Sequence, residues 1–288
     1  MHCPACDGEA TLRYRLTYPV YQCHLCGLYF AQDPSFHMDF KSMVDERVRE
    51  IALKQLRMAN FTTIVSHLSN LLREGATGLE VGSGYGWFLD AIAQAGYQCF
   101  GIEPEPAMVE KSRAAGHKII QGFFPADLPE FATHFDFVVF NDALEHIPNI
   151  QSILRATHSL LNPGGILVVN LPLSDGLFYR LAHLANFLGV PTGLERLWQF
   201  AFTSPHYYYF SRKNLASTLK RYGFEPVAYH RVKTLDPNRL VERISMDVAT
   251  TRLARVMSLP LRMLLPAVSI LREDVGCMYA RRTNTIAG

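Results

Sequence analysis

Residues 78–90 read GLEVGSGYGWFLD, and this stretch decides the fold. A short apolar run ends in three glycines at alternate positions, Gly82, Gly84 and Gly86, and an amphipathic run follows them. Glycine lets a backbone approach a ligand closely and adopts positive φ without strain. A strand, a glycine loop and a helix in this order predict the ligand-binding crossover of an open α/β sheet.

Strands and helices are expected to alternate on both sides of this loop. Short apolar runs read as strands at residues 78–81, 98–102, 118–120, 135–140, 166–170, 224–230 and 276–281. Other segments read as helices, at residues 43–72, 87–95, 106–115, 150–161, 212–222, 239–256 and 261–271. Alternation with strands this apolar predicts a parallel sheet that is covered by helices on both faces.

The composition limits the class of protein. The 288 residues are 49% hydrophobic and 19% charged, which supplies a core and argues against a disordered chain. The formal net charge is only +2, so no nucleic-acid partner is expected, because non-specific binding needs a concentrated basic face. The N-terminus has no signal-peptide pattern, and the apolar tract 256–271 is shorter than the roughly 20 residues of a membrane span. We therefore expect a cytoplasmic protein.

Four of the six cysteines form two pairs, Cys3 with Cys6 and Cys23 with Cys26. Each pair can place two thiolates on one tight turn, and two facing turns make a tetrahedral site that suits Zn²⁺. Residues 11–22 alternate apolar and polar side chains, so residues 1–32 are predicted to form a zinc ribbon around a small hairpin. A rubredoxin-type iron site has the same pattern, whereas disulfides are disfavoured in a reducing compartment. With four thiolates bound, the metal is structural.

The order of residues in the glycine loop discriminates between two cofactors. A dinucleotide site needs its third glycine at position 87, where this chain has Trp87. Glu80 stands two residues ahead of the first glycine, and a carboxylate there suits a cationic ligand and repels a pyrophosphate. S-adenosylmethionine carries a sulfonium and an ammonium group, so it fits this loop better. Glu103, at the end of the next strand, suits ribose hydroxyls and supports either nucleoside cofactor.

The chain resembles the class I S-adenosylmethionine-dependent methyltransferases from about residue 43 to residue 282. The segments that carry the resemblance are LEVGSGYGWFL, GIEPEP, FDFVVFNDALEHIPN, LNPGGILVVNLP and HYYYFSRKNLASTLKRYGFEPV. The resemblance implies an α/β Rossmann-like sheet of seven strands in the order 3-2-1-4-5-7-6, with the seventh strand antiparallel. It implies a methyltransferase domain over residues 43–288, with a lid inserted at about 171–204.

The resemblance also implies a set of cofactor-binding residues. They are Glu80, Gly82, Ser83, Gly84, Gly86, Glu103, Pro104, Phe123, Asn141 and Asp142. The glycine loop and Glu80 would hold the methionine part, Glu103 the ribose, and the region of Phe123 the adenine. Asn141 would offer its carbonyl oxygen to the methionine amino group. Gln121 stands where the family often has a side chain for the adenine amine, and this leaves that contact open.

Two histidines are candidates for a catalytic base. His206 follows Ser204-Pro205 at the exit of the lid, where similar methyltransferases place a histidine that faces the pocket. A histidine titrates in the range that a base requires, although His206 can instead pack the lid onto the sheet. His146 is the reserve candidate. It belongs with Asp142 and Glu145 to a stretch that resembles a proposed metal site in ubiquinone-pathway O-methyltransferases, but we favour a structural role for that stretch.

The apolar segments 171–204 and 256–271 are expected to form a lid with its own small core. The alternatives are a wide apolar mouth for a lipid-linked or aromatic acceptor, or a peripheral contact with a membrane.

The leading hypothesis is an enzyme that methylates oxygen on a small or carrier-linked acceptor, such as a sugar, a lipid-linked compound or a phenol. The rivals are a partner-binding zinc-ribbon protein with a vestigial pocket, and a nicotinamide-dependent oxidoreductase. The oligomeric state is not predicted.

Overall fold

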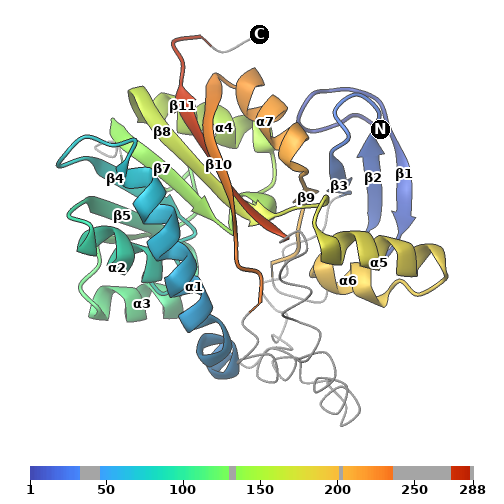
Figure 1. Cartoon of the computed structure of the whole chain (residues 1–288), viewed down its shortest axis with the longest axis horizontal. Helices are drawn as coiled ribbons and strands as arrows, with labels where there is room; N and C mark the ends of the chain where they lie inside the picture. The colour runs from blue at the N-terminus through green and yellow to red at the C-terminus, as the bar shows by residue number, and fades with distance from the viewer. Residues whose placement is uncertain (33–45, 130–133, 201–203, 236–273, 286–288) are drawn as a thin grey trace.

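The structure is a computed structural model that describes residues 1–32, 46–129, 134–200, 204–235 and 274–285. The helices expected at 239–256 and 261–271 lie outside these residues. The described chain contains a seven-stranded sheet with helices around it and a second, four-stranded sheet beside it (Figure 1). Within the described helices, none is both long enough and apolar enough to cross a membrane.

The seven-stranded sheet has the predicted order. From one edge to the other its strands are β6 (Ile119–Gln121), β5 (Gln98–Glu103), β4 (Thr77–Val81), β7 (Phe135–Asn141), β8 (Leu161–Pro172), β11 (Val275–Arg282) and β10 (Phe224–Val232). Strand β11 runs antiparallel to both of its neighbours, β8 and β10. The other described pairings in this sheet are parallel. The order 3-2-1-4-5-7-6 is therefore confirmed.

One strand begins earlier than expected. We expected a strand at 166–170 after the turn residues 162–165, but β8 begins at Leu161, which pairs with Phe135. A register shift between Phe135 and Phe137 accommodates the intervening turn without ending the strand.

Alternate side chains of the central strands enter two separate cores. In β7, Val138 and Phe140 pack with the core under α4 (Ile150–Leu160) and α7 (Arg212–Arg221). Phe137 and Val139 point the other way and pack with residues of α1 (Glu46–Ser69) and α2 (Trp87–Gln94). Helix α3 (Pro106–Ala114) packs through Val109 against Leu89 and Ile119. This period of two explains why the strands are apolar throughout.

The predicted hairpin is confirmed, and its sheet has an additional strand from the distant part of the chain. Strands β1 (Ala10–Arg15) and β2 (Pro19–Cys23) pair in antiparallel fashion, and β3 (Tyr29–Ala31) extends them. The fourth strand is β9 (Tyr208–Tyr209), which lies just after the lid. The lid contains α5 (Leu177–Phe187) and α6 (Thr192–Leu197). The ribbon is thus built into the methyltransferase-like part of the fold.

The lid has the small core expected of it, but part of this core comes from the ribbon. Tyr14 and Val20 of the ribbon strands pack with Leu194 and Trp198 of the lid. Both Val20 and Trp198 are fully buried. Burial of side chains this large is the main stabilising term available to so small a unit. The lid and the ribbon therefore depend on each other for their burial.

Candidate functional site

All three glycines of the loop after β4 adopt a left-handed conformation. The φ angles are 73° at Gly82, 51° at Gly84 and 79° at Gly86. A Cβ atom on Gly86 would lie 2.5 Å from atoms of His117 and Ser112, whereas one on Gly84 would meet nothing closer than 3.9 Å. The alternation of glycines therefore follows from backbone conformation, and at Gly84 it leaves open space beside the backbone.

Glu103 fixes the glycine loop at the carboxyl end of β5. Its Oε2 accepts a hydrogen bond of 2.9 Å from the Gly84 N–H, and its Oε1 accepts one of 3.0 Å from the Glu105 N–H. Burial raises the pKa of this carboxyl, while the two backbone hydrogen bonds oppose the rise. Each carboxylate oxygen has a second lone pair, so Glu103 can hold the loop and still accept ribose hydroxyls.

Glu80 is buried with one oxygen that lacks a hydrogen-bond partner. Its Oε1 accepts a 2.9 Å hydrogen bond from Asn141 Nδ2, and its Oε2 is unpartnered. Asn170 Nδ2 donates in turn to Asn141 Oδ1 at 3.4 Å, so three buried polar side chains form a chain across β4, β7 and β8. Burial raises the pKa of Glu80 to about 8, and repulsion from Glu103 adds to the rise. An unpartnered buried oxygen of this kind fits a cationic ligand, because a cation restores the lost solvation.

Arg57 is a residue of the site that sequence reasoning missed. Its Nη1 lies 2.7 Å from Asp142 Oδ2, and both side chains are about a quarter exposed. Asp142 has a φ of 47°, and its N–H donates to the Asn170 carbonyl oxygen, so its position after β7 is fixed. The Arg57 charge also acts to lower the pKa of Glu80 and of Glu145. The site therefore has a cation beside its carboxylates, placed there by α1.

The remaining predicted cofactor residues lie in the loops that follow β4, β5 and β6, at the carboxyl edge where an open α/β sheet has its ligand crevice. Ser83 is buried with an unpartnered hydroxyl, and Pro104 directly follows Glu103 at the end of β5. The Phe123 ring is half exposed, and its N–H donates to Asp127 Oδ2 at 2.7 Å. This bond fixes the backbone of the loop after β6 and leaves a ring face accessible.

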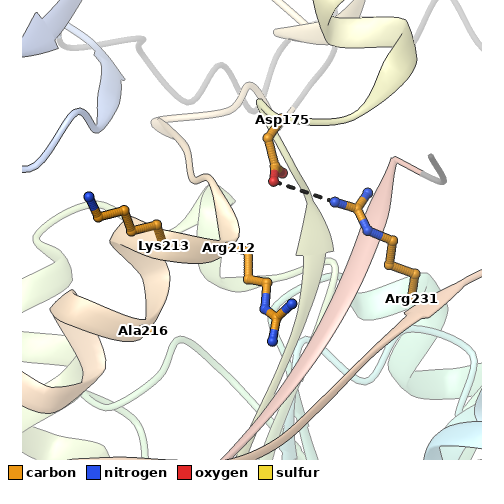
Figure 2. Close-up of a pocket in the computed structure, with 5 residues that line it drawn as sticks. All are labelled: Asp175, Arg212, Lys213, Ala216 and Arg231. Atoms are coloured by element: carbon orange, nitrogen blue, oxygen red, sulfur yellow. Dashed lines mark hydrogen bonds and ion pairs between the residues drawn. The ribbon is translucent and has the colours of Figure 1, made fainter.

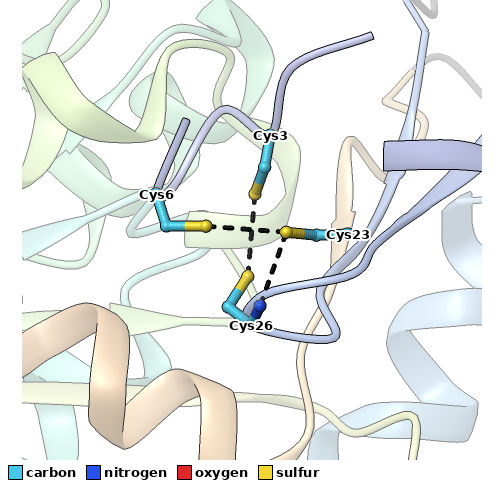
Figure 3. A group of neighbouring side chains, drawn as sticks. All are labelled: Cys3, Cys6, Cys23 and Cys26. Carbon is cyan, nitrogen blue, oxygen red and sulfur yellow. Dashed lines mark hydrogen bonds between the residues drawn. The ribbon is translucent and has the colours of Figure 1, made fainter. Parts of the chain in front are cut away.

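The four predicted zinc ligands converge in space (Figure 3). Cys3 Sγ lies 3.7 Å from Cys26 Sγ, and Cys6 Sγ lies 3.5 Å from Cys23 Sγ. A tetrahedron with zinc–sulfur bonds of about 2.3 Å has edges of about 3.8 Å, so the spacing fits Zn²⁺. A Cβ on Gly8 would lie 3.2 Å from Cys23 Sγ and 2.8 Å from Leu25 Cβ, so glycine is needed where the backbone packs on the cluster. The hydrogen bond with Cys26 lowers the pKa of Cys3 to about 5.

His206 and His146 are brought together with Glu145. The two imidazole centroids are 4.5 Å apart, and one ligand atom from each of the three side chains lies within 4.8 Å of the others. Glu145 belongs to the short helix η1 (Leu144–His146), and both of its carboxyl oxygens are buried without a partner. Burial raises the pKa of Glu145 well above its ordinary value, and Asp142 adds to this. Burial lowers the pKa of His206 well below its ordinary value, with a further contribution from His146.

Backbone hydrogen bonds connect this cluster to the ribbon. The Tyr207 N–H donates to the Glu145 carbonyl oxygen at 2.7 Å, and the Ala31 N–H of the ribbon donates to the Tyr207 carbonyl oxygen at 2.9 Å. His206 itself donates its N–H to the Trp198 carbonyl oxygen at 3.0 Å. The His146 ring is held by a hydrogen bond of 3.1 Å between Nδ1 and the Pro205 carbonyl oxygen. The loop that carries His206 is therefore fixed by the ribbon, the lid and η1 together.

The described chain has a cavity of about 520 Å³ that is lined by residues outside the Glu145–His146–His206 cluster (Figure 2). Its lining consists of Asp175, Arg212, Lys213, Ala216 and Arg231. Arg231 Nη2 lies 3.4 Å from Asp175 Oδ2, and the Arg212 guanidinium stacks over Tyr229 at 4.2 Å. Because β8 and β10 both run antiparallel to β11, their carboxyl ends share the edge at which this cavity lies. The predicted cofactor residues do not line this cavity, whose lining has three cationic side chains and one carboxylate.

Comparison of the sequence with known protein families identifies the family to which the chain belongs. Residues 52–229, more than half of the chain, match the family model described as a methyltransferase domain. Ubiquinone biosynthesis O-methyltransferase of Xanthomonas axonopodis pv. citri (strain 306) is 36% identical over 104 residues, which cover 33% of this chain and 43% of that protein. The C-methyltransferase NovU of Streptomyces niveus is 27% identical over 184 residues, 58% of this chain and 39% of that protein. The chain thus spans less than half the length of these two relatives.

Solved structures agree with the family in their fold. The 1,6-didemethyltoxoflavin-N1-methyltransferase of Burkholderia thailandensis, solved with bound S-adenosylhomocysteine, has a TM-score of 0.50 at 18% identity and covers 83% of this chain and 84% of its own. The phosphoethanolamine N-methyltransferase 2 of Haemonchus contortus, solved with S-adenosyl-L-methionine, has a TM-score of 0.53 at 15% identity, with coverage of 77% and 52%. The chain therefore belongs to the methyltransferase-domain family and has the fold of the class I S-adenosylmethionine-dependent methyltransferases.

Proposed function

We propose that this protein transfers a methyl group from S-adenosylmethionine to an oxygen atom of a small or carrier-linked acceptor. The observation that carries the proposal is the unpartnered Oε2 of Glu80, buried beside a loop of left-handed glycines. A buried carboxyl with an open lone pair ionises most readily beside a cation, whereas a nicotinamide dinucleotide would bring a pyrophosphate to the same place. The family match to residues 52–229 supports the same cofactor.

Each residue of the crevice has a proposed task toward the cofactor. Glu80 accepts from the methionine ammonium group, and Glu103 accepts from the ribose hydroxyls while it holds Gly84. Arg57, already paired with Asp142, is placed to bind the methionine carboxylate. The Phe123 ring flanks the adenine. When bound, S-adenosylmethionine supplies a methyl group on a positively charged sulfur, and the protein contributes orientation and exclusion of water.

On the acceptor side, we propose His206 as the group that accepts the hydroxyl proton. Its low pKa keeps the imidazole neutral at neutral pH, which is the state that accepts a proton. The adjacent Glu145 carboxyl can ionise when a positive charge forms on the ring, and this stabilises the imidazolium. The alternative is a divalent cation held by Glu145, His146 and His206, because these ligand types bind such ions.

The charged side chains that line the cavity suggest the class of acceptor that we propose. Three cationic side chains and one carboxylate line the cavity at the carboxyl edge, so an acceptor with a phosphate or carboxylate group would find a partner there. Both an O-methyltransferase and a C-methyltransferase occur among the relatives, and we propose O-methylation because His206 is the proposed proton acceptor.

We propose that the four cysteines bind a structural Zn²⁺. The sulfur–sulfur spacings of 3.5 and 3.7 Å match the edges of a zinc–thiolate tetrahedron. Four thiolates complete the coordination of the ion, so its contribution is to the fold of the ribbon and, through β3 and β9, to the loop that carries His206.

Isothermal titration with S-adenosylmethionine and with NAD tests the cofactor. We expect binding of the first and none of the second. Transfer of a labelled methyl group to extract metabolites then tests the enzyme, because a vestigial pocket in a partner-binding protein predicts no uptake. A reagent that cleaves methyl ethers then separates the two reactions, because it removes the label from an O-methylated product and not from a C-methylated one.

A further inference from the structure

Helix α5 of the lid exposes apolar side chains along its outer face. The exposed fractions are 53% for Leu181, 56% for Leu184, 81% for Phe187 and 71% for Leu188, and Val190 beyond the helix is 51% exposed. Positions 181, 184 and 188 are spaced by three and four, so they lie on one face of the helix. The opposite face, with Tyr179 and Ala182, is buried in the lid core. Helix α5 is therefore apolar on both faces.

Another surface helix shows that this pattern is unusual for the molecule. The exposed positions of α7 are polar, and they are Arg212, Lys213, Ser217, Lys220 and Arg221. Contiguous exposed apolar residues on a helix mark an interaction surface far more often than single ones do.

Exposed arginines lie on α5 and on the elements beside it, whereas Asp274 accepts a hydrogen bond from the Phe178 N–H at the N-terminus of the helix. Arg180 is exposed on α5 itself, and Arg196 is exposed on α6. Arg13 of the ribbon is exposed and forms a hydrogen bond of 3.2 Å with His183 of α5, which places it at the side of the helix. Helix α5 has no acidic residue, and Glu195 of α6 is turned to the ribbon, where it accepts from the Thr17 N–H at 2.7 Å.

We propose that the outer face of α5 binds the surface of a lipid bilayer that carries anionic headgroups. Apolar side chains flanked by arginines match the boundary between acyl chains and phosphates, because the arginine stems lie along the apolar region while the guanidinium groups reach the phosphates. An eleven-residue helix is too short to cross a bilayer, so the helix lies in the plane of the surface. A second copy of this chain fits less well, since a symmetric contact would bring the arginine rims together.

The helix follows β8, whose carboxyl end lies at the same edge of the sheet as the carboxyl ends of β4, β5 and β7 (Figure 1). Binding by α5 would therefore bring the crevice close to the membrane surface. This placement suits a membrane-bound acceptor, but the proposal itself concerns α5 and stands whether or not the protein transfers methyl groups.

Co-sedimentation of the full chain with vesicles tests the proposal. Vesicles of phosphatidylcholine alone are compared with equal parts of phosphatidylcholine and phosphatidylglycerol, at low and high salt. We expect binding to the mixed vesicles that weakens with salt, and about tenfold weaker binding for Leu184→Glu/Phe187→Glu. The control is Val227→Glu, which places one such charge at another exposed apolar position, on β10, and should bind like the unmodified protein.

Three results would overturn the proposal. The first is no binding of the unmodified protein to mixed vesicles at low salt, and the second is equal binding by Leu184→Glu/Phe187→Glu. The third is a dimer in sedimentation velocity that this variant converts to monomer without any vesicle binding, which assigns the face to a second copy. If Leu184→Glu/Phe187→Glu melts at a lower temperature than the unmodified protein, Arg180→Gln/Arg196→Gln is used in its place. Weaker binding of that variant to the mixed vesicles supports the proposal, and unchanged binding overturns it. S-adenosylmethionine affinity is measured in parallel, so that failure of the cofactor assignment remains distinguishable.

Discussion

The proposed cofactor half and the proposed acceptor half of the site are built in different ways. On the proposed cofactor side, Glu80 and Glu103 lie at the ends of two neighbouring strands, Glu103 accepts a hydrogen bond from the Gly84 N–H, and Glu80 accepts one from Asn141. On the acceptor side, Glu145 and His206 come from distant segments, and the ribbon and lid hold them together. The first half is a property of the sheet, and the second depends on separate units that fold onto it. The two halves should therefore fail independently.

Removal of the proposed structural Zn²⁺ should have the largest effect and should separate the two halves. Structural Zn²⁺ contributes roughly 10 kcal/mol or more to small domains. Its loss through Cys6→Ser should unfold the ribbon and release β9, so methyl transfer disappears while S-adenosylmethionine affinity changes only a few-fold. Metal content by mass spectrometry, titration calorimetry and hydrogen exchange in residues 204–210 provide the measurements.

Cys99→Ser is the matched control, since Cys99 lies in β5 outside the cluster, and this variant should retain both zinc and activity. An equal loss of cofactor affinity and of turnover in Cys6→Ser would show that the two halves are one cooperative unit.

Replacement of His206 should give the next largest effect. General-base catalysis contributes about 10²- to 10⁴-fold, so His206→Ala should lower kcat by that factor with unchanged cofactor affinity. Because burial holds the pKa of His206 well below its ordinary value, kcat/KM for the acceptor, measured with saturating S-adenosylmethionine, should stay level as the pH falls from 8 through 6.5 and decline only at lower pH. His158→Ala is the control, because it removes a buried ring that bonds the Thr283 carbonyl oxygen away from the crevice.

A decline of kcat/KM centred near pH 6.5 would instead indicate a histidine with an ordinary pKa. Restoration of activity by added Mg²⁺ or Mn²⁺ after treatment with a chelator would favour the metal alternative over the base.

The same contrast explains what the sequence predicts and what it does not. The strands and the glycine loop are local patterns, and Glu103 follows from its place at the end of the next strand, so the positions of these residues could be predicted from the sequence. Arg57 could not, because one arginine on a helix that precedes the first strand carries no distinctive signal. The pairing of β3 with Tyr208–Tyr209 also escaped prediction, since a two-residue strand has no periodicity.

Substitution of Glu80 by glutamine should weaken S-adenosylmethionine binding about 10- to 100-fold. The amide keeps an acceptor oxygen for Asn141 and removes only the charge, and hydrogen bonds to charged groups contribute about 1.5 to 3 kcal/mol. With a folded-state pKa raised to about 8, the carboxyl of the empty protein is largely protonated at pH 7. Cofactor binding should therefore release a proton and strengthen as the pH rises toward 8. Calorimetry in two buffers of different ionisation enthalpy measures both quantities.

The sign of the stability effect is opposite to that of the binding effect. Because the pKa of Glu80 is raised on folding, its contribution to stability is fully present below about pH 4.5 and is lost as the pH rises through about 8. Glu80→Gln should consequently melt at a higher temperature than the unmodified protein at pH 9. The exposed Glu110→Gln serves as the control and should change neither binding nor melting.

The smallest expected effect compares a glycine of the loop with a left-handed glycine that lies before β4. Gly84 and Gly75 both have left-handed φ angles, 51° and 69°, and neither would place a Cβ in close contact with the described chain. Replacement of either by alanine should thus cost a similar ~1 kcal/mol of stability, which follows from backbone conformation alone. Only at position 84 does the new methyl group enter the crevice, so only Gly84→Ala should also weaken S-adenosylmethionine binding, by about fivefold. Equal cofactor affinity in the two variants would mean that the open space beside Gly84 is not where the ligand lies.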